Sequence, residues 1–242
     1  MELSTLLAIL AVSLGIGIQA WVGIGFGLVS APLLYWISPD YVPGPILVLG
    51  FVLSALVTFK HYREICWQRV VTASIARIPG AWLGAMLLIS VPSGWLGLIL
   101  GSCLLLALLV TRYRFTVKIS PVTLRFAGFS SGVMGTATSV GGPPMAMLYR
   151  GIETQIARNE LALFFLLTTP ISIVMLAVNG LFNASTLVMT LPLLPGVFLG
   201  YQLANAFNHY LDEQSAKGIL FALCLLAALS VLAKAAIDLA SP

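Results

Sequence analysis

The sequence contains little charge. Asp, Glu, Lys and Arg together make up 8% of the 242 residues, whereas 60% of the residues are hydrophobic. A soluble domain carries about 25% charged residues, because its surface has to face water. This composition excludes a soluble globular protein and predicts an all-α integral membrane protein whose main surroundings are the lipid bilayer.

Acidic residues and histidines are scarcest where the sequence is most apolar. No Asp or Glu falls within the body of a predicted membrane span, and Glu160 is expected at a helix end or in a loop. The two histidines, His61 and His209, are expected in loops. Cation sites are typically built from carboxylates, and proton relays in membranes use Asp, Glu or His. The sequence therefore favours an anion over a cation as the ligand held inside the membrane.

Cysteine is rare and scattered. Cys66, Cys103 and Cys224 lie far apart with no C-x-x-C spacing, which indicates neither a metal cage nor a disulfide framework. We expect no metal and no cofactor. The N-terminal stretch MELSTLLAIL lacks the basic region of a signal peptide, so the first apolar segment is expected to be retained.

Apolar segments long enough to cross a bilayer recur along the chain. A helix needs about 20 such residues to cross the hydrocarbon, and the pattern predicts about eight to ten membrane segments. Two long segments, Leu3–Trp36 and Val122–Tyr149, are interrupted by Gly and Pro and are predicted to be broken helices. The other expected helices cover about Pro45–Phe59, Val70–Ser90, Trp95–Thr111, Leu161–Val178, Ala184–Leu203 and Ala216–Ile237.

The connecting loops differ in charge, which predicts their orientation. Lys and Arg accumulate in cytoplasmic loops, so the basic loops are expected inside. The alternation of basic and neutral loops requires each interrupted segment to return the chain to the side it entered from, as a hairpin or re-entrant pair. Both termini are then outside; one long tilted helix per interrupted segment would reverse the loops. The basic loops are Lys60–Arg69, Arg112–Lys118 and Arg150–Arg158, and the loops without Lys or Arg are Ser38–Gly44, Val91–Gly94 and Asn179–Asn183.

The formal net charge of +4 is explained by this orientation. The basic residues cluster in the loops expected on one membrane face rather than in a patch suited to phosphates. We therefore expect no nucleic-acid partner.

The two halves of the chain, 1–118 and 119–242, resemble each other. IPGAWLGAML at 78–87 matches LPGVFLGYQL at 194–203, and other segments match in the same order. Corresponding loops carry opposite charge bias, which predicts two inverted repeats within one membrane domain. Inverted repeats with interrupted helices are typical of transporters, whose substrate binds near the midplane at the repeat interface.

The interruptions mark the candidate site. Non-helical backbone at membrane depth is tolerated only inside protein or beside a water-filled cavity. A helix that begins there exposes N–H groups and a partial positive charge, which suit an anion. The residues expected to break helices are Gly23, Gly25, Gly27, Pro32, Gly135 and the Gly-Gly-Pro-Pro run at 141–144. The predicted anion contacts are Gly25, Gly27, Arg77, Thr136, Thr138, Ser139, Gly141 and Gly142.

Glycines in these segments have a second interpretation, because small residues also let membrane helices pack closely. For the run at 141–144 we favour the site, since adjacent prolines remove backbone donors. We favour close packing for the pairs Gly80/Gly84, Gly196/Gly200 and Gly97/Gly101.

Arg77 is the one ionisable residue expected well inside a span. An Arg at the centre of a membrane helix costs about 2.5–3.5 kcal/mol on insertion scales, which indicates a functional role. The alternative is that its side chain extends to the cytoplasmic interface. The repeat counterpart of Arg77 is Leu193, so the fold does not require a charge there. Both interpretations stay open from the sequence.

Several motifs together resemble the TauE/SafE family of sulfite and organosulfonate exporters. They are GFGLVSAPLL at 25–34, GFSSGVMGTATSVGGPPMAMLY at 128–149 and PGAWLGAML at 79–87. The resemblance implies two related halves and movement of sulfite, sulfonates or other sulfur-containing anions across a bacterial cytoplasmic (inner) membrane.

The leading interpretation is thus an exporter of a small anionic substrate, compatible with a homo-oligomer. Its alternative within transport is an exporter of an amino acid or another small metabolite or sulfur compound. An intramembrane enzyme would need a paired nucleophile and base or a metal cluster at depth, and neither occurs in the sequence. A scaffold subunit would not need interrupted helices.

Overall fold

The computed structural model describes residues 3–22, 25–61, 65–92, 95–112, 117–207 and 213–240, so Gly23 lies outside the described residues. The described part of the chain is helical throughout, joined by short connections, which confirms the predicted all-α class. The elements of the first half are α1 (Leu3–Val22), α2 (Phe26–Ile37), η1 (Pro39–Tyr41), α3 (Gly44–His61), α4 (Trp67–Ser90) and α5 (Leu96–Arg112). Those of the second half are α6 (Pro121–Thr138), α7 (Gly142–Leu148), η4 (Tyr149–Gly151), α8 (Thr154–Val178), α9 (Ala184–Thr190), η5 (Leu191–Leu193), α10 (Leu194–Phe207) and α11 (Glu213–Ala240).

Helix length and composition agree with an integral membrane protein. Large apolar side chains such as Leu10, Phe126 and Leu226 are exposed on the outside of the bundle, where lipid would cover them. Within the described residues, four segments are long and apolar enough to cross a membrane: Pro39–Lys60, Trp67–Ser90, Thr154–Val178 and Ala184–Ala204. Shorter apolar helices cover Leu3–Gln19, Phe26–Ile37, Leu96–Leu109 and Phe221–Ile237.

Prolines affect the helices differently from what the sequence predicts. Pro32 lies inside α2, as does Gly27, and Gly135 lies inside α6, so the expectation of a break at these three positions is wrong. Pro143 and Pro144 lie in the first turn of α7, where no intrahelical donor is required. The helix expected over Ala184–Leu203 is divided into α9 and α10 by the 3-10 turn Leu191–Leu193, in which Pro192 cannot donate a backbone hydrogen bond.

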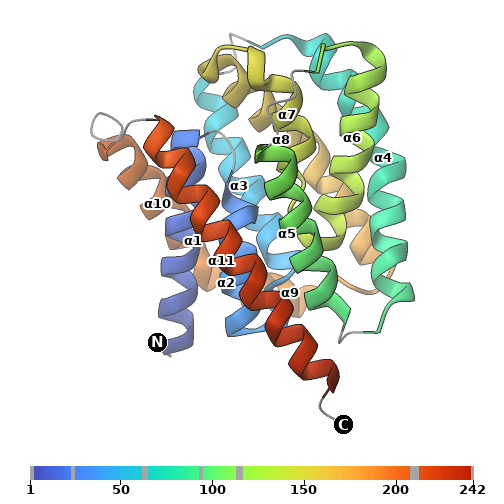
Figure 1. Cartoon of the computed structure of the whole chain (residues 1–242), viewed down its shortest axis with the longest axis vertical. Helices are drawn as coiled ribbons and strands as arrows, with labels where there is room; N and C mark the ends of the chain where they lie inside the picture. The colour runs from blue at the N-terminus through green and yellow to red at the C-terminus, as the bar shows by residue number, and fades with distance from the viewer. Residues whose placement is uncertain are drawn as a thin grey trace.

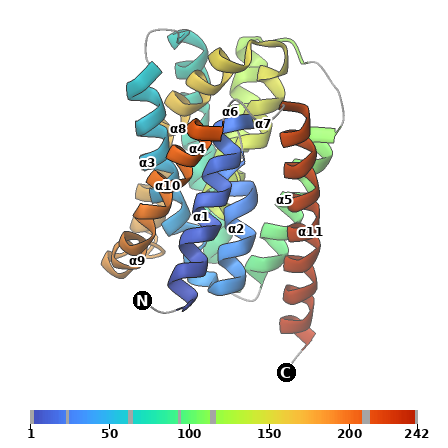
Figure 2. The ribbon, with the colours of Figure 1, turned by 90° about the vertical axis from the view of Figure 1, so that its left-hand side faces the viewer.

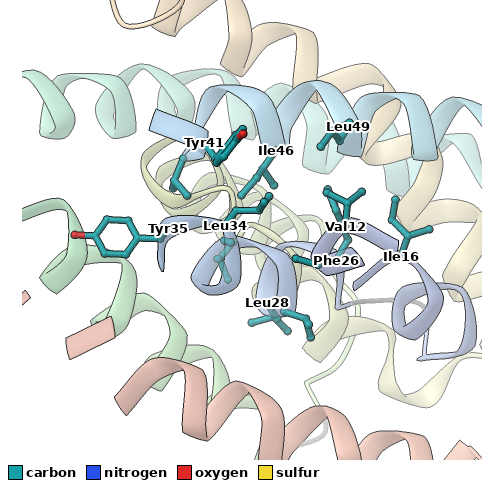
Figure 3. Close-up of a cluster of buried hydrophobic side chains, with 14 of the residues drawn as sticks. Val12, Ile16, Phe26, Leu28, Leu34, Tyr35, Tyr41, Ile46 and Leu49 are labelled. Atoms are coloured by element: carbon teal, nitrogen blue, oxygen red, sulfur yellow. The ribbon is translucent and has the colours of Figure 1, made fainter. Parts of the chain in front are cut away.

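The largest buried cluster joins α1, α2 and α3. Val12 and Ile16 of α1, Phe26 of α2 and Ile46 and Leu49 of α3 are nearly or fully buried in it. Figure 3 shows these side chains from the three helices close together. The cluster holds α2 in place, and the first turn of α2 forms one wall of the site described below.

Glycines allow the closest helix contacts. A Cβ at Gly84 of α4 would lie 2.6 Å from the Val133 carbonyl oxygen of α6, and one at Gly200 of α10 would lie 2.5 Å from the Ser13 carbonyl oxygen of α1. A Cβ at Gly101 of α5 would lie 2.5 Å from the Leu232 side chain of α11. The packing interpretation of these glycines is confirmed.

The helices form one bundle in which helices of the first half of the chain pack along helices of the second half. α4 packs along α6, and α10 packs along α1; α3 packs along α8, and α5 along α11. α1 packs on α2 and α6 packs on α7, so each half contains a pair of neighbouring helices separated by a short interruption. α1 begins and α11 ends at the same, lower end of the bundle (Figures 1 and 2).

Candidate functional site

A small cavity of about 60 Å³ lies where the interruptions of the two halves meet. Six of the eight predicted contacts line it, namely Gly25, Gly27, Arg77, Ser139, Gly141 and Gly142. The remaining lining residues are Gln19, Phe26, Leu28, Ile46, Leu47, Gly50, Ser54, Gly135, Val140, Phe165 and Thr169. A cavity of this volume holds about four water molecules, which is comparable to the size of a small oxyanion.

Arg77 supplies the charge of this cavity. Its side chain is only 1% exposed, so the interpretation that it extends to the membrane interface is wrong. Its Nη1 donates to Ser131 Oγ at 2.9 Å, its Nη2 donates to Ser172 Oγ at 3.5 Å, and its buried Nε has no partner. The guanidinium also lies 5.2 Å from the ring centroid of Phe164. Within the described residues Arg77 forms no ion pair, so its buried positive charge has only neutral neighbours.

Two serines and a glycine hold the guanidinium in position. Ser131 donates to the Gly141 carbonyl at 2.6 Å, which links Arg77 to the interruption between α6 and α7. Ser172 of α8 accepts a 2.8 Å hydrogen bond from Thr136. A Cβ at Gly135 would lie 2.9 Å from Arg77 Nη2, so the absence of a side chain there makes room for the guanidinium.

The interruption after α6 is a sharp turn at Ser139. Ser139 adopts the left-handed conformation with φ 64°, and α7 begins at Gly142. α2 approaches this turn so closely that a Cβ at Gly27 would overlap the Ser139 carbonyl oxygen. The two interruptions therefore contact each other across the wall of the cavity.

The start of α2 forms the facing wall. Gly25 precedes it with φ 144°, a conformation that favours glycine. Gln19 Oε1 accepts a hydrogen bond from the backbone N–H of Phe26 at 3.0 Å. The next N–H groups, those of Gly27 and Leu28, belong to the first turn of a helix and have no intrahelical acceptor. Together with Arg77 these groups give the cavity a positive electrostatic character.

Thr136 and Thr138 are the two predicted contacts that do not line the cavity. Both side chains are fully buried. Thr136 bonds to Ser172, whereas Thr138 donates to the Met134 carbonyl oxygen at 2.7 Å. They lie behind the cavity wall and support it.

Several residues at the cavity were missed in the sequence. Ser54 of α3 and Thr169 of α8 place hydroxyl-bearing side chains on its wall, and Phe165 adds an aromatic ring. A hydroxyl residue inside an apolar helix was the available signal for Ser54 and Thr169. It is a weak signal, because such side chains often bond to their own backbone, as Thr168 does to the Phe164 carbonyl oxygen.

Glu160 is a correction to the sequence analysis. α8 begins at Thr154 rather than near Leu161, so Glu160 lies within the helix and is fully buried. Its carboxylate accepts hydrogen bonds from Arg69, from the backbone N–H of Cys66 at 3.1 Å and from the Tyr149 hydroxyl at 2.9 Å. The carboxylate is paired and does not line the small cavity, so it does not give the site a cation-binding group.

A larger cavity of about 690 Å³ is lined by residues of η1, the last turn of α4, the start of α5 and α9. Its wall includes Asp40, Pro43, Leu88 and Thr186 from segments that the sequence places in or next to the neutral loops. Ser139 Oγ of the small cavity donates a 2.9 Å hydrogen bond to the Pro43 carbonyl oxygen, so the two cavities share a wall. No group of three or more His, Cys, Asp or Glu residues suited to a metal occurs in the described ranges.

Comparison with known proteins identifies the family. A family model described as "Sulfite exporter TauE/SafE" matches residues 7–231. Neither the curated proteins nor the solved structures contain a match to the chain. The matched region covers nearly the whole chain and includes every residue of the small cavity. The chain therefore belongs to the sulfite exporter TauE/SafE family of membrane transporters.

Proposed function

We propose that this protein exports sulfite or an organosulfonate across the bacterial cytoplasmic membrane. The anion would bind near the midplane, in the small cavity formed by the interrupted helices of two inverted repeats. One observation carries this proposal: Arg77 is buried at the cavity with no carboxylate against it in the described structure. An unpaired charge at depth is costly, and a transported anion would supply the missing partner.

The donor groups of the cavity favour an oxyanion. Arg77, the first-turn amides of α2 and the Ser54 and Thr169 hydroxyls belong to four different helices, α4, α2, α3 and α8. An oxyanion presents several acceptor oxygens and can use donors from different sides. Sulfite also fits the volume of about 60 Å³ without further opening, whereas an organosulfonate needs room for its carbon chain.

The exchanged packing of the two halves supports an inverted repeat of residues 1–118 and 119–242. Helix α4 packs on α6 as α10 packs on α1, and α11 packs on α2 as α5 packs on α7. A two-fold axis that relates the halves would produce this exchange. In such a repeat α3 corresponds to α8 and α5 to α11. Each of these helices packs on its own counterpart, so both contacts would lie on or beside the axis.

The loop charges support the orientation of the bundle. The basic loops around Arg69, Lys118 and Arg150 precede or follow helix ends opposite to the end where α1 begins and α11 ends. Lys and Arg mark the cytoplasmic side, so the lower end in Figure 1, with both termini, would face outward.

An amino acid is a poorer passenger for this cavity. Its ammonium group would need a carboxylate or several acceptors, and no acidic residue lines the cavity. An amino acid would also bring its cation close to the Arg77 guanidinium.

Ligand binding and flux test the proposal. Purified protein should be stabilised against heating by sulfite or by a small sulfonate such as sulfoacetate, and not by neutral amino acids. Protein reconstituted in liposomes should release the stabilising anion from the lumen. If no sulfur oxyanion stabilises the protein or crosses the liposome membrane, the proposed substrate class is wrong.

A further inference from the structure

The larger cavity contacts the site through a thin barrier. Pro43, the residue just before α3, lines the larger cavity, and Leu47 in the first turn of α3 lines the small one. The backbone N–H of Leu47 donates to the Pro43 carbonyl oxygen at 3.1 Å, so the two residues are directly joined. The start of α3 therefore separates the two cavities.

Two kinds of contact close this barrier. The first is the 2.9 Å hydrogen bond from Ser139 Oγ to the Pro43 carbonyl oxygen. The second is apolar: Leu47 belongs to a packed cluster in which Leu88 also takes part, and Leu88 lines the larger cavity. Neither contact involves a charge, so separating them exposes no unpaired ion.

A serine at position 139 is suited to holding the barrier closed. Ser139 is the only non-glycine residue with positive φ in the described ranges, and glycine adopts that conformation more readily. Its hydroxyl forms a bond across the barrier that glycine would not form. The left-handed turn also directs the Ser139 carbonyl oxygen toward Gly27 of α2. A single residue thus joins the turn to both α3 and α2.

The chemistry of the larger cavity suits release rather than capture of an anion. Among the described residues that line it, Asp40 is the only charged one, and Asn183, Ser185 and Thr186 are neutral. An anion that enters this space leaves the positive field of Arg77 and meets a carboxylate. Its affinity should fall on the way out.

We propose that the larger cavity is the exit vestibule of the transport path, and that the Ser139–Pro43 hydrogen bond with Leu47 forms the gate between it and the site. This inference rests on the proposed function only for the identity of the passenger. Opening requires loss of one hydrogen bond and displacement of one leucine side chain. The hydrogen bond belongs to the turn that also carries anion contacts, and the leucine belongs to α3, which lines the small cavity, so binding and opening involve the same two segments.

Cysteine accessibility tests the gate without any substrate. Ser54→Cys places a thiol in the small cavity, and Ser185→Cys places one in the larger cavity; the parent chain gives the background of the native cysteines. A membrane-impermeant thiol reagent is applied to intact cells and, separately, to inside-out vesicles. Ser185→Cys identifies the membrane face on which the larger cavity opens. From that face Ser54→Cys should react much more slowly than Ser185→Cys.

Weakening the gate should expose the site from that face. Adding Ser139→Gly to Ser54→Cys keeps the left-handed turn accessible and removes the hydroxymethyl side chain that donates the hydrogen bond to Pro43. The reaction should then be about two- to tenfold faster, the shift expected for loss of one hydrogen bond. Leu47→Ala removes most of the leucine side chain from the same barrier and should have a similar effect. Ser185→Gly is the matched control, because its hydroxyl bonds to Asn183 on the same side of the barrier.

The outcomes separate the gate from the substrate. Equal reactivity of Ser54→Cys and Ser185→Cys from that face, or no increase with either gate variant in monodisperse protein, overturns the gate. Faster labelling in a protein that moves no sulfur oxyanion would retain the gate and reject the proposed substrate. Sulfite flux with unchanged labelling would retain the proposed substrate and reject the gate.

Discussion

Arg77 is held by side chains that the sequence does not place near it. Ser131 lies 54 residues away and Ser172 lies 95 residues away along the chain. The sequence predicted that Arg77 is a candidate ligand because a charge inside an apolar span is rare. It did not predict the inward direction of the side chain, since that depends on Gly135 of another helix leaving space for the guanidinium.

Replacing Arg77 with leucine should separate binding from stability. Arg77→Leu removes the charged donor, so affinity for the anion should fall about ten- to hundredfold, the range for hydrogen bonds to a charged group. The ligand-free protein should be as heat-stable as the parent or more so, because an unpaired buried charge is lost. Thermal unfolding with and without sulfite measures both effects.

Arg125→Leu is the control for this prediction, since Arg125 is an exposed arginine on α6. It should change neither affinity nor flux. Unchanged sulfite affinity in Arg77→Leu would remove Arg77 from the site.

Gly27 should tolerate no side chain. In Gly27→Ala the new Cβ would overlap the Ser139 carbonyl oxygen, which belongs to backbone and cannot rotate away. We expect a loss of about 1–3 kcal/mol in the free energy of unfolding, typical of overpacking, and reduced flux because the two interruptions are pushed apart. Chemical denaturation in detergent and liposome efflux measure these quantities.

Gly151→Ala provides the comparison, because a Cβ there meets nothing within 4 Å. Its stability should stay within about 0.5 kcal/mol of the parent. Equal stability of the two variants would contradict the close approach of α2 to the turn.

At the scale of helices, the sequence predicted the elements better than their ends. The expected helices at Val70–Ser90 and Trp95–Thr111 correspond to α4 and α5 within a few residues. α8 begins earlier than expected. Its first turns carry polar residues, and a prediction based on hydropathy leaves such residues out of a membrane span. The polar side chain of Glu160 is accommodated there by hydrogen bonds from other elements, which a hydropathy pattern cannot register.

Glu160 of α8 should stabilise the packing of α8 against α4 and η4. Its carboxylate receives hydrogen bonds from Arg69 in α4, from the residue before α4 and from Tyr149 in η4. Glu160→Gln keeps the shape but removes the charge, so unfolding should become easier by about 1.5–3 kcal/mol, the range for charged hydrogen bonds. Thermal or denaturant unfolding provides the measurement.

Glu153→Gln is the matched change, made at an exposed carboxylate just before α8. It should leave stability unchanged. If both variants unfold alike, the Glu160 contacts do not hold these elements together.

At the scale of the whole molecule, the inverted repeat stays a prediction. The matching segments 78–87 and 194–203 lie on α4 and α10, which pack on α6 and α1 respectively. The sequence could not predict the positions of the two cavities, because their walls combine side chains from several helices of both halves.

Export of an anion should depend on the membrane potential. Moving an anion out of a negative interior is favourable by about 2.3 kcal/mol of free energy per charge at 100 mV. This corresponds to an outside-to-inside concentration ratio of about fiftyfold at equilibrium. Collapsing the potential with a potassium ionophore at equal potassium concentrations should slow efflux from loaded liposomes. Equal efflux at zero and at negative internal potential would show that another gradient drives the export.

The single arginine has a consequence for how voltage acts on the cycle. Arg77 is the one charged residue among the described residues that line the small cavity, so the proposed site would carry one fixed positive charge. A monovalent passenger would cancel that charge, and the occupied carrier would then cross between its two states with almost no electrical work. The potential would instead act on the empty carrier, whose uncompensated arginine is drawn toward the negative cytoplasm and reset for the next ion.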